Sequence, residues 1–526
     1  MTRIAVIADP HVHDCDWSPR DSGLGRAIRT WADTAASTRV FNESLPAFHA
    51  ALQRAVDKGA RLALLVGDLT DDGQAPNIRA ALHVIAAFRD RYGLRVLATP
   101  GNHDLFALAG RAQDKNFIGI SGESVPLRSD TCPEAATLGT QDALEKMRAL
   151  AYWPDPADLH WETPFGQDPD WAARSYEARS PDGSARCQMI DASYLVEPEP
   201  GLWILSLDAN VCIPRDGARD FSQASSFHDA TDGGWSAVID QRPYLLGWMA
   251  DVAARARAAG KHLVAFSHYP PTDVLGGTGA GEIALFGATG LARRIPPEDI
   301  AQAFAATGVR LHFSGHLHVN DTARHGTGAE GFFNIAVPSP VGFAPAMKML
   351  DLADNQARIR TLSLCDIPGH DRAYSAYLSE AGWLGQPAPF AAHAPDHGAF
   401  LDRHLTGLVR DRYMAREWPA EMADFASRAR MADLAGILGI EVETPDLPLR
   451  HLAEDWYRLR KAGVLAEPFV AAERLAFYRL LCAEIPDLTG DSLASRFAAL
   501  LRILDGYLHR LPNGDFSIDL KALTIS

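Results

Sequence analysis

Short runs of apolar residues that end abruptly in polar residues recur through the first two-thirds of the chain. They lie at residues 4–8, 62–66, 96–99, 202–207, 263–267, 311–314 and 332–337. Their length and their polar boundaries predict buried β-strands. Between them, residues 45–56, 78–88 and 245–258 repeat apolar positions every three or four residues, which predicts amphipathic helices. Strands that alternate with helices indicate an α/β architecture.

Three stretches interrupt this alternation. Residues 105–170 are rich in Pro, Gly, Asp and Trp, and form either an insertion over one edge of a site or a surface excursion without a role. Residues 211–243 and 271–297 are predicted to be loops. The second of these contains the glycines at 276, 277, 279 and 281, whose spacing does not fit a nucleotide-binding glycine motif.

After about residue 366 the composition shifts towards Ala, Leu, Arg and Glu with helical periodicity. Residues 400–409 and 497–508 carry apolar stripes, and Asp491 and Ser492 mark the start of the second helix. A chain of 526 residues also exceeds the usual size of one hydrophobic core. We therefore predict an α/β domain at residues 1–365 and a mostly helical domain at 366–526, which would act as a cap or as an oligomerisation element.

Composition narrows the classes of partner. The chain has 50 Lys and Arg residues against 66 Asp and Glu, a formal net charge of −16. This balance argues against broad binding to nucleic acid or to an anionic membrane, but not against a phosphorylated substrate, because bound cations can reverse the local field. The six cysteines form no Cys-x-x-Cys pair, which argues against a structural zinc site or a dense disulfide scaffold.

Five small polar clusters stand out, four of them directly after a predicted strand. Each alone is explained by a turn, a helix cap or a structural histidine. Together they bring imidazoles and carboxylates, the ligands that suit Zn, Fe, Mn or Co, to the strand ends of one α/β scaffold. The clusters are Asp9-Pro10-His11, Gly67-Asp68, Gly101-Asn102-His103-Asp104, Ser267-His268 and Gly315-His316-Leu317-His318.

The ordered set D-x-H, G-D, G-N-H-D, H and G-H-x-H resembles the calcineurin-like metallophosphoesterase superfamily over roughly residues 1–365. The resemblance implies a four-layer sandwich of two mixed β-sheets flanked by helices. It implies two divalent or mixed-valence transition metal ions (Mn, Fe, Zn or Co), with a bridging hydroxide as the nucleophile. The implied ligands are Asp9, His11 and His318 for one metal, Asn102, His268 and His316 for the other, and Asp68 between them. His103 would contact the phosphoryl group or protonate the leaving oxygen.

The block at residues 67–73 gives a finer comparison. Asp71 matches an Asp that orients the G-N-H histidine in Ser/Thr protein phosphatases, so it either positions His103 or is only a turn carboxylate. In that subgroup the next residue is an Arg that binds the phosphate, whereas this chain has Asp72 at that position. The change disfavours a phosphoprotein phosphatase. The sequence of this block and that of residues 267–271 more closely resemble the class III cyclic-nucleotide phosphodiesterase and glycerophosphodiesterase branch.

We therefore expect a phosphodiesterase that acts on a small phosphorylated substrate. Two alternatives stay open: a phosphomonoesterase or nucleotidase that uses the same site, and a non-catalytic scaffold that keeps the fold. No secretory h-region and no apolar run of transmembrane length is present, so we expect a cytoplasmic protein without a membrane partner. A homo-oligomer formed through the C-terminal domain also stays open.

Overall fold

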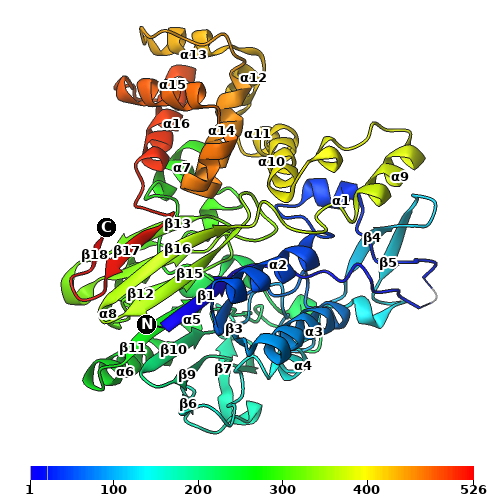
Figure 1. The fold of residues 1–526 in the computed structure, drawn as a ribbon, viewed down its shortest axis with the longest axis vertical. Helices are drawn as coiled ribbons and strands as arrows, with labels where there is room; N and C mark the ends of the chain where they lie inside the picture. The colour runs from blue at the N-terminus through cyan, green and yellow to red at the C-terminus, as the bar shows by residue number, and fades with distance from the viewer. Residues whose placement is uncertain (1, 21) are drawn as a thin grey trace.

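The computed structural model describes residues 2–20 and 22–526 and contains two seven-stranded mixed β-sheets (Figure 1). The first sheet has the order β18-β17-β16-β15-β1-β2-β3, in which β1, β2 and β3 are parallel and the other neighbours antiparallel. Its strands are β1 (Thr2–Ile7), β2 (Leu62–Val66), β3 (Arg95–Thr99), β15 (Ala346–Ala353), β16 (Gln356–Ser363), β17 (Phe516–Asp519) and β18 (Thr524–Ile525).

The second sheet has the order β13-β14-β12-β11-β10-β9-β6. Its four central strands, β10, β11, β12 and β14, are parallel, and the outer strands are antiparallel to their neighbours. The strands are β6 (His160–Glu162), β9 (Tyr194–Glu199), β10 (Leu202–Leu207), β11 (His262–Ser267), β12 (Leu311–Ser314), β13 (Asp321–His325) and β14 (Phe332–Ala336).

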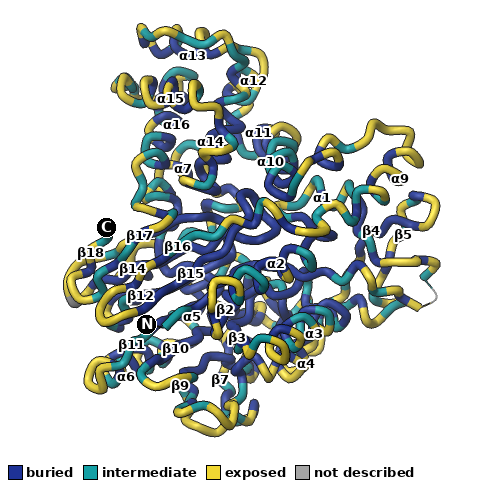
Figure 2. Tube along the Cα trace, in the orientation of Figure 1, coloured by how far each residue is buried: buried dark blue, intermediate teal, exposed yellow. Residues whose placement is uncertain are grey.

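The two sheets pack against each other through buried side chains. Tyr194 of β9 donates its hydroxyl to the carbonyl of Ala98 in β3 at 2.9 Å, and Thr99 donates to the carbonyl of Leu207 at 3.0 Å. Every residue of β2 and of β10 is buried, which explains their uninterrupted apolar sequences. In Figure 2 the strands at the centre are dark blue, because helices cover the outer faces.

Helices flank the sandwich on both sides. The first sheet carries α2 (Ser44–Asp57) and α3 (Ala75–Tyr92), with α4 (Thr140–Met147) beside α3. The second sheet carries α5 (Gly234–Gln241), α6 (Tyr244–Ala258) and α8 (Glu298–Ala306). In α6 the buried positions include Leu245, Met249, Val252 and Ala256, the apolar stripe read from the sequence. The predicted four-layer sandwich is therefore confirmed.

The interrupting stretches contain more regular structure than their composition indicates. Residues 105–170 include the hairpin of β4 (Asp114–Ile118) and β5 (Ser124–Arg128), together with α4 and β6. A second hairpin pairs β7 (Ser175–Arg179) with β8 (Arg186–Ile190). The loop predicted at 271–297 is wrong in part, because residues 279–286 form helix α7 (Gly279–Phe286). Gly279 and Gly281 lie inside that helix and lower its intrinsic propensity, so the sequence pattern was misleading.

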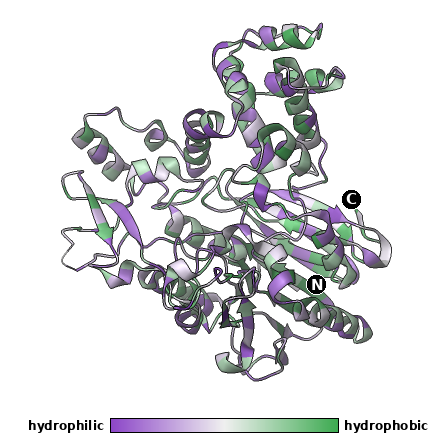
Figure 3. Cartoon of the chain, turned by 180° about the vertical axis from the view of Figure 1, so that it is seen from behind, coloured by the Kyte–Doolittle hydropathy of each residue, from purple (hydrophilic) through white to green (hydrophobic). Residues whose placement is uncertain are grey.

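The region after residue 366 is mostly helical, as predicted. It contains α9 (Tyr374–Leu384), α10 (His397–Leu408), a π-helical turn (Val409–Tyr413), α11 (Met414–Arg416), α12 (Ala420–Arg428), α13 (Met431–Leu438), α14 (Arg450–Ala462), α15 (Ala472–Ala483) and α16 (Leu493–Leu508). Helices α12 to α16 rise from one end of the sandwich (orange to red in Figure 1). Figure 3 shows hydrophobic and hydrophilic segments side by side along these helices, as amphipathic packing requires.

The chain returns to the first sheet after α16. Strand β17 pairs antiparallel with β16, with Phe516 opposite Ile359, and β18 pairs with β17. These two short edge strands were not predicted from the sequence. The helical region thus lies between two segments of one sheet, while a domain boundary at residue 365 stays a prediction.

Candidate metal centre

The polar clusters predicted from the sequence meet where the central strands end. Asp9 and His11 follow β1, Asp68 follows β2, and Asn102 follows β3. From the second sheet, His268 follows β11, while His316 and His318 follow β12. All seven side chains are buried, with exposed fractions of 0–7 %. Because the carboxyl ends of parallel strands lie at one edge of a sheet, residues far apart in the sequence converge.

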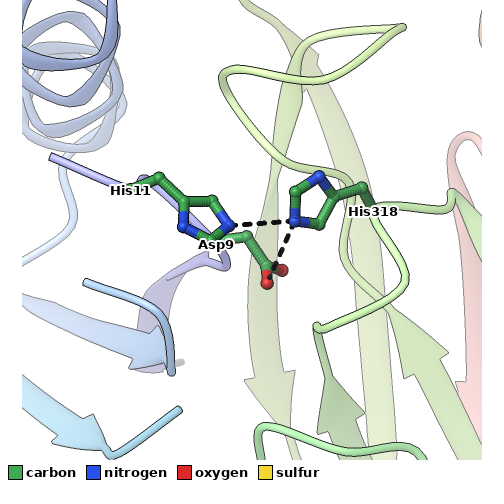
Figure 4. Close-up of side chains that lie close together, drawn as sticks. All are labelled: Asp9, His11 and His318. Atoms are coloured by element: carbon green, nitrogen blue, oxygen red, sulfur yellow. Dashed lines mark hydrogen bonds and ion pairs between the residues drawn. The ribbon is translucent and has the colours of Figure 1, made fainter. Parts of the chain in front are cut away.

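Asp9, His11 and His318 form the first group of potential ligands (Figure 4). The Nε2 atoms of His11 and His318 are 3.0 Å apart, and His318 Nε2 lies 3.5 Å from Asp9 Oδ1. Two imidazole nitrogens and one carboxylate oxygen therefore point to one place, with all ligand atoms within 4.8 Å of one another.

Asp68, His268 and His316 form the second group. His268 Nε2 lies 3.2 Å from Asp68 Oδ2, 3.1 Å from Asn102 Oδ1 and 3.2 Å from His316 Nδ1. Asp68 Oδ2 is also 3.7 Å from His11 Nε2 of the first group. One carboxylate therefore reaches both groups, the position predicted for a bridging ligand.

Hydrogen bonds on the outer side of the second group leave the inward nitrogens free. His268 Nδ1 lies 3.1 Å from the carbonyl of Val66, and His316 Nε2 lies 2.9 Å from the carbonyl of Thr231. A carbonyl only accepts, so each of these nitrogens donates its hydrogen outward. The inward His268 Nε2 and His316 Nδ1 are then available to a cation, the arrangement usual for histidine ligands.

Charge at the site favours a cation between the groups. Burial lowers the pKa of His11, His316 and His318, so these imidazoles are neutral, the form that binds metals. Burial also opposes a charge on His268, but the Asp68 carboxylate outweighs it and raises the pKa of His268 to about 9. A positive charge is therefore stabilised at His268 Nε2, where a metal ion would replace the proton. The donor set thus fits two transition metal ions.

The backbone at these residues is unusual. Asp9, His11, Asp68, His316 and His318 all have positive φ angles, between 44° and 69°. Residues other than glycine rarely adopt this left-handed conformation, and it concentrates at functional sites.

Neighbouring glycines allow the ligand loops to approach closely. A Cβ atom on Gly101 would lie 2.1 Å from Asp68 Oδ1, and one on Gly315 would lie 2.5 Å from Asp9 Oδ2. Neither position therefore accommodates a side chain.

His103 lies beside the two groups without joining them. Its backbone N–H donates to Asp68 Oδ1 at 2.8 Å, and its Nδ1 lies 2.9 Å from Asp72 Oδ1. Burial opposes ionisation of Asp72, but Lys115 and His103 outweigh it and lower the pKa of Asp72. Asp72 is therefore an ionised partner that orients the His103 ring.

The prediction that Asp71 orients His103 is wrong, because Asp72 occupies that position. Asp71 is fully buried and accepts hydrogen bonds from Arg39 Nη2 at 2.7 Å, Lys115 Nζ at 2.9 Å and Arg29 Nη1 at 3.2 Å. Adjacent carboxylates in a turn point in different directions, and the sequence pattern did not distinguish them. Asp71 instead fixes Arg39, whose Nη2 lies 3.2 Å from His103 Nδ1.

A cavity of about 280 Å³ opens onto the metal ligands and His103. Arg39 lines it, and so do residues from the second sheet and from the C-terminal helices. The motifs gave no signal for these side chains, which reach the cavity only through tertiary packing. Its charged and aromatic lining residues beyond the motifs are Arg39, Arg294, Arg412, Tyr413, Glu417, Arg460 and Lys461.

A comparison with family models matches residues 2–155 to the calcineurin-like phosphoesterase family. This match confirms the resemblance predicted from the motifs over the segment that it covers. The matched segment contains Asp9, His11, Asp68, Asn102 and His103, while the histidines of the second sheet lie beyond it. A sequence search of curated proteins finds no match.

Solved structures that match this chain share little sequence with it. A dimetal phosphatase from Danio rerio has 13 % identity and a TM-score of 0.38, over 69 % of this chain and 96 % of that one. TT1561 of Thermus thermophilus has 9 % identity and a TM-score of 0.29, over 68 % and 93 %. GAP50, the anchor in the inner membrane complex of Plasmodium, has 11 % identity and a TM-score of 0.26, over 69 % and 84 %.

Among residues 2–20 and 22–526, no helix is long and apolar enough to cross a membrane.

Proposed function

We propose that this protein is a metal-dependent phosphodiesterase that hydrolyses a small phosphodiester. The observation that carries the proposal is the convergence of Asp9, His11, Asp68, Asn102, His268, His316 and His318 into two adjoining ligand groups beside His103. When bound there, two metal ions would supply Lewis-acid activation of water and of the phosphoryl oxygens. The ligands assigned to each ion are those given by the superfamily resemblance.

His103 and Arg39 have separate tasks in this proposal. Asp72 accepts the hydrogen of His103 Nδ1, so the ring is held in one orientation. His103 Nε2 then holds a proton that it donates to the leaving oxygen. Arg39, held by Asp71, contacts a phosphoryl oxygen from the cavity wall.

Charge balance around His103 supports a diester. Arg29, Arg39 and Lys115 are paired with three carboxylates, Asp33, Asp71 and Asp72. This network therefore adds no net positive charge next to the phosphoryl group, which suits the single charge of a diester better than the second charge of a monoester. Arg39 itself favours the other candidate, a phosphomonoesterase, because a guanidinium binds a phosphate dianion well.

The test uses purified protein reconstituted with Mn, Fe, Zn or Co and checked for metal content by elemental analysis. We expect about two metals per chain and faster release of p-nitrophenolate from bis(p-nitrophenyl) phosphate than from p-nitrophenyl phosphate. His316→Ala should abolish both activities, whereas His83→Ala, on the exposed face of α3, should leave them unchanged. Absence of turnover with every metal would refute the proposed enzymatic function. A content of fewer than two metals per chain would favour a non-catalytic scaffold.

A further inference from the structure

The C-terminal helices form part of the wall of the metal-site cavity. Arg412 and Tyr413 of the π-helical turn line it, together with Glu417, and Arg460 and Lys461 line it from the end of α14. Hydrogen bonds join this wall to the α/β sandwich. His404 Nε2 donates to the carbonyl of Thr34 at 2.9 Å, and the backbone N–H of Asn320 donates to the carbonyl of Lys461 at 2.8 Å. The wall is therefore fixed relative to the metal ligands of the same chain.

Three of the five Arg and Lys side chains in the cavity are neutralised by carboxylates. Arg39 pairs with Asp71, Arg294 with Asp232, and Arg460 with the fully buried Glu282. These pairs leave little net charge for a ligand, because each guanidinium is already matched.

Arg412 and Lys461 differ from the other three. Arg412 Nη1 donates to the carbonyl of Ala36 at 2.6 Å, and Lys461 Nζ donates to the carbonyl of Leu317 at 3.0 Å. Within residues 2–20 and 22–526, no carboxylate lies within 4.0 Å of either cationic group. The carboxylate of Glu417 also faces the cavity; its Oε2 accepts a hydrogen bond from the neutral hydroxyl of Tyr457 at 3.1 Å, and it forms no ion pair with either cationic group.

The burial of Lys461 makes its missing partner informative. Only 7 % of the residue is exposed, and a buried ammonium without an anion is costly. An anion in the cavity would offset this cost. The π-helical turn is an independent indication, since such turns are rare and concentrate at functional sites. Here the turn directs Arg412 and Tyr413 into the cavity, and Tyr413 stacks on Tyr457 with ring centroids 4.8 Å apart.

We propose that Arg412 and Lys461 form a subsite for a second anionic group of the substrate, a carboxylate or a phosphate distinct from the scissile phosphodiester. The inference rests on the proposed function, since it assigns the substrate of the same site. A cavity of about 280 Å³ holds a small molecule and not a protein segment. The substrate would therefore be a small phosphodiester with one additional negative charge.

The test compares three p-nitrophenyl phosphodiesters that differ only at the far end of a short alkyl group. One ends in a carboxylate, one in a phosphonate and one in an uncharged amide. The leaving group is the same, so a difference in kcat/KM reports the far end. The wild type should prefer an anionic end by about tenfold or more, the usual effect of one charge-assisted hydrogen bond, and mainly through KM. The anionic end with the higher kcat/KM identifies the group that the subsite binds.

Arg412→Gln should bring the three substrates to similar kcat/KM values, because the loss is much larger for the two anionic ends than for the amide. Arg416→Gln removes the same charge from an exposed residue outside the cavity and should keep the wild-type preference. Lys461→Met should act like Arg412→Gln, provided that its circular dichroism is unchanged. If it does not fold, Arg412→Gln alone decides.

Failure of the subsite is distinguishable from failure of the proposed function. Equal kcat/KM for the three substrates, or an equal loss on all three in Arg412→Gln, would overturn the subsite and leave the phosphodiesterase intact. If the wild type hydrolyses none of them, the proposed function fails. Calorimetric binding of the matching non-hydrolysable phosphonate analogues then tests the subsite: tighter binding of the anionic ends that is lost in Arg412→Gln would support it, and equal binding would overturn it.

Discussion

The adjacent carboxylates Asp71 and Asp72 provide the sharpest test of the mechanism. Asp72→Asn replaces the ionised partner of His103 Nδ1 by a neutral amide but keeps the size of the side chain. A hydrogen bond with an ionised partner contributes about 1.5–3 kcal/mol, which corresponds to a change of about 10–150-fold in rate. The 2.9 Å contact and the partial burial of Asp72 place it in this range.

The expected loss depends on the leaving group. An alkoxide needs a proton as it departs, so Asp72→Asn should lower kcat for a dialkyl phosphodiester by the full factor. p-Nitrophenolate leaves without protonation, so kcat for bis(p-nitrophenyl) phosphate should hardly change. The assay follows the dialkyl substrate by phosphorus NMR and the aryl substrate by absorbance, with equal metal content confirmed in both proteins.

Asp71→Asn serves as the contrasting variant. It leaves Arg29, Arg39 and Lys115 with one carboxylate fewer in a buried cluster. It should therefore lower thermal stability and reduce kcat/KM for both substrates by the same factor. Equal losses on both substrates in Asp72→Asn, or a leaving-group dependence in Asp71→Asn instead, would refute the assignment of Asp72 to His103.

Three further predictions concern stability and the metal site. Metal ions at about a hundredfold excess over their Kd should stabilise the fold by about 2.7 kcal/mol, seen as a rise in Tm that a chelator reverses and that His316→Ala lacks. Gly101→Ala should lose metal and activity, because its Cβ would lie 2.1 Å from Asp68 Oδ1; Gly247→Ala, which has open space, should keep both by elemental analysis and turnover. Burial raises the pKa of Glu43 from 4.5 to about 8. Glu43 therefore ionises at a lower pH in the unfolded chain than in the folded protein, and the free energy of unfolding falls as the pH rises through this interval. Between pH 5 and pH 8 the Tm of Glu43→Gln should therefore fall less than the Tm of the wild type. An equal fall would contradict the conclusion that the buried Glu43 carboxyl is neutral.

The sequence was most informative where local pattern and chemistry coincide. Strands β2 and β10 are buried on both faces, so their residues form uninterrupted apolar runs that end at the sheet edge. The potential ligands directly follow such runs, and their order along the chain carries the superfamily resemblance. The sandwich and the convergence of Asp9, Asp68 and His316 could therefore be predicted without coordinates.

Features that depend on tertiary packing could not be predicted in this way. Arg39, Arg412 and Lys461 lie in a loop, a π-helical turn and a helix end whose sequences resemble ordinary surface segments. The choice between Asp71 and Asp72 depends on side-chain directions in one turn. Strands β17 and β18 are too short to show a pattern, with four and two residues.

The location of the unpaired cations has a consequence for substrate choice. The charges around His103 balance within the α/β sandwich, whereas Arg412 and Lys461 come from the helical region. A net charge of −16 for the whole chain gives no sign of this local excess of positive charge. The bond that is cleaved and the molecule that is selected would then depend on different parts of the chain. Changes in the helical wall should therefore alter KM and substrate preference, while kcat for an aryl diester without a second charged group stays the same.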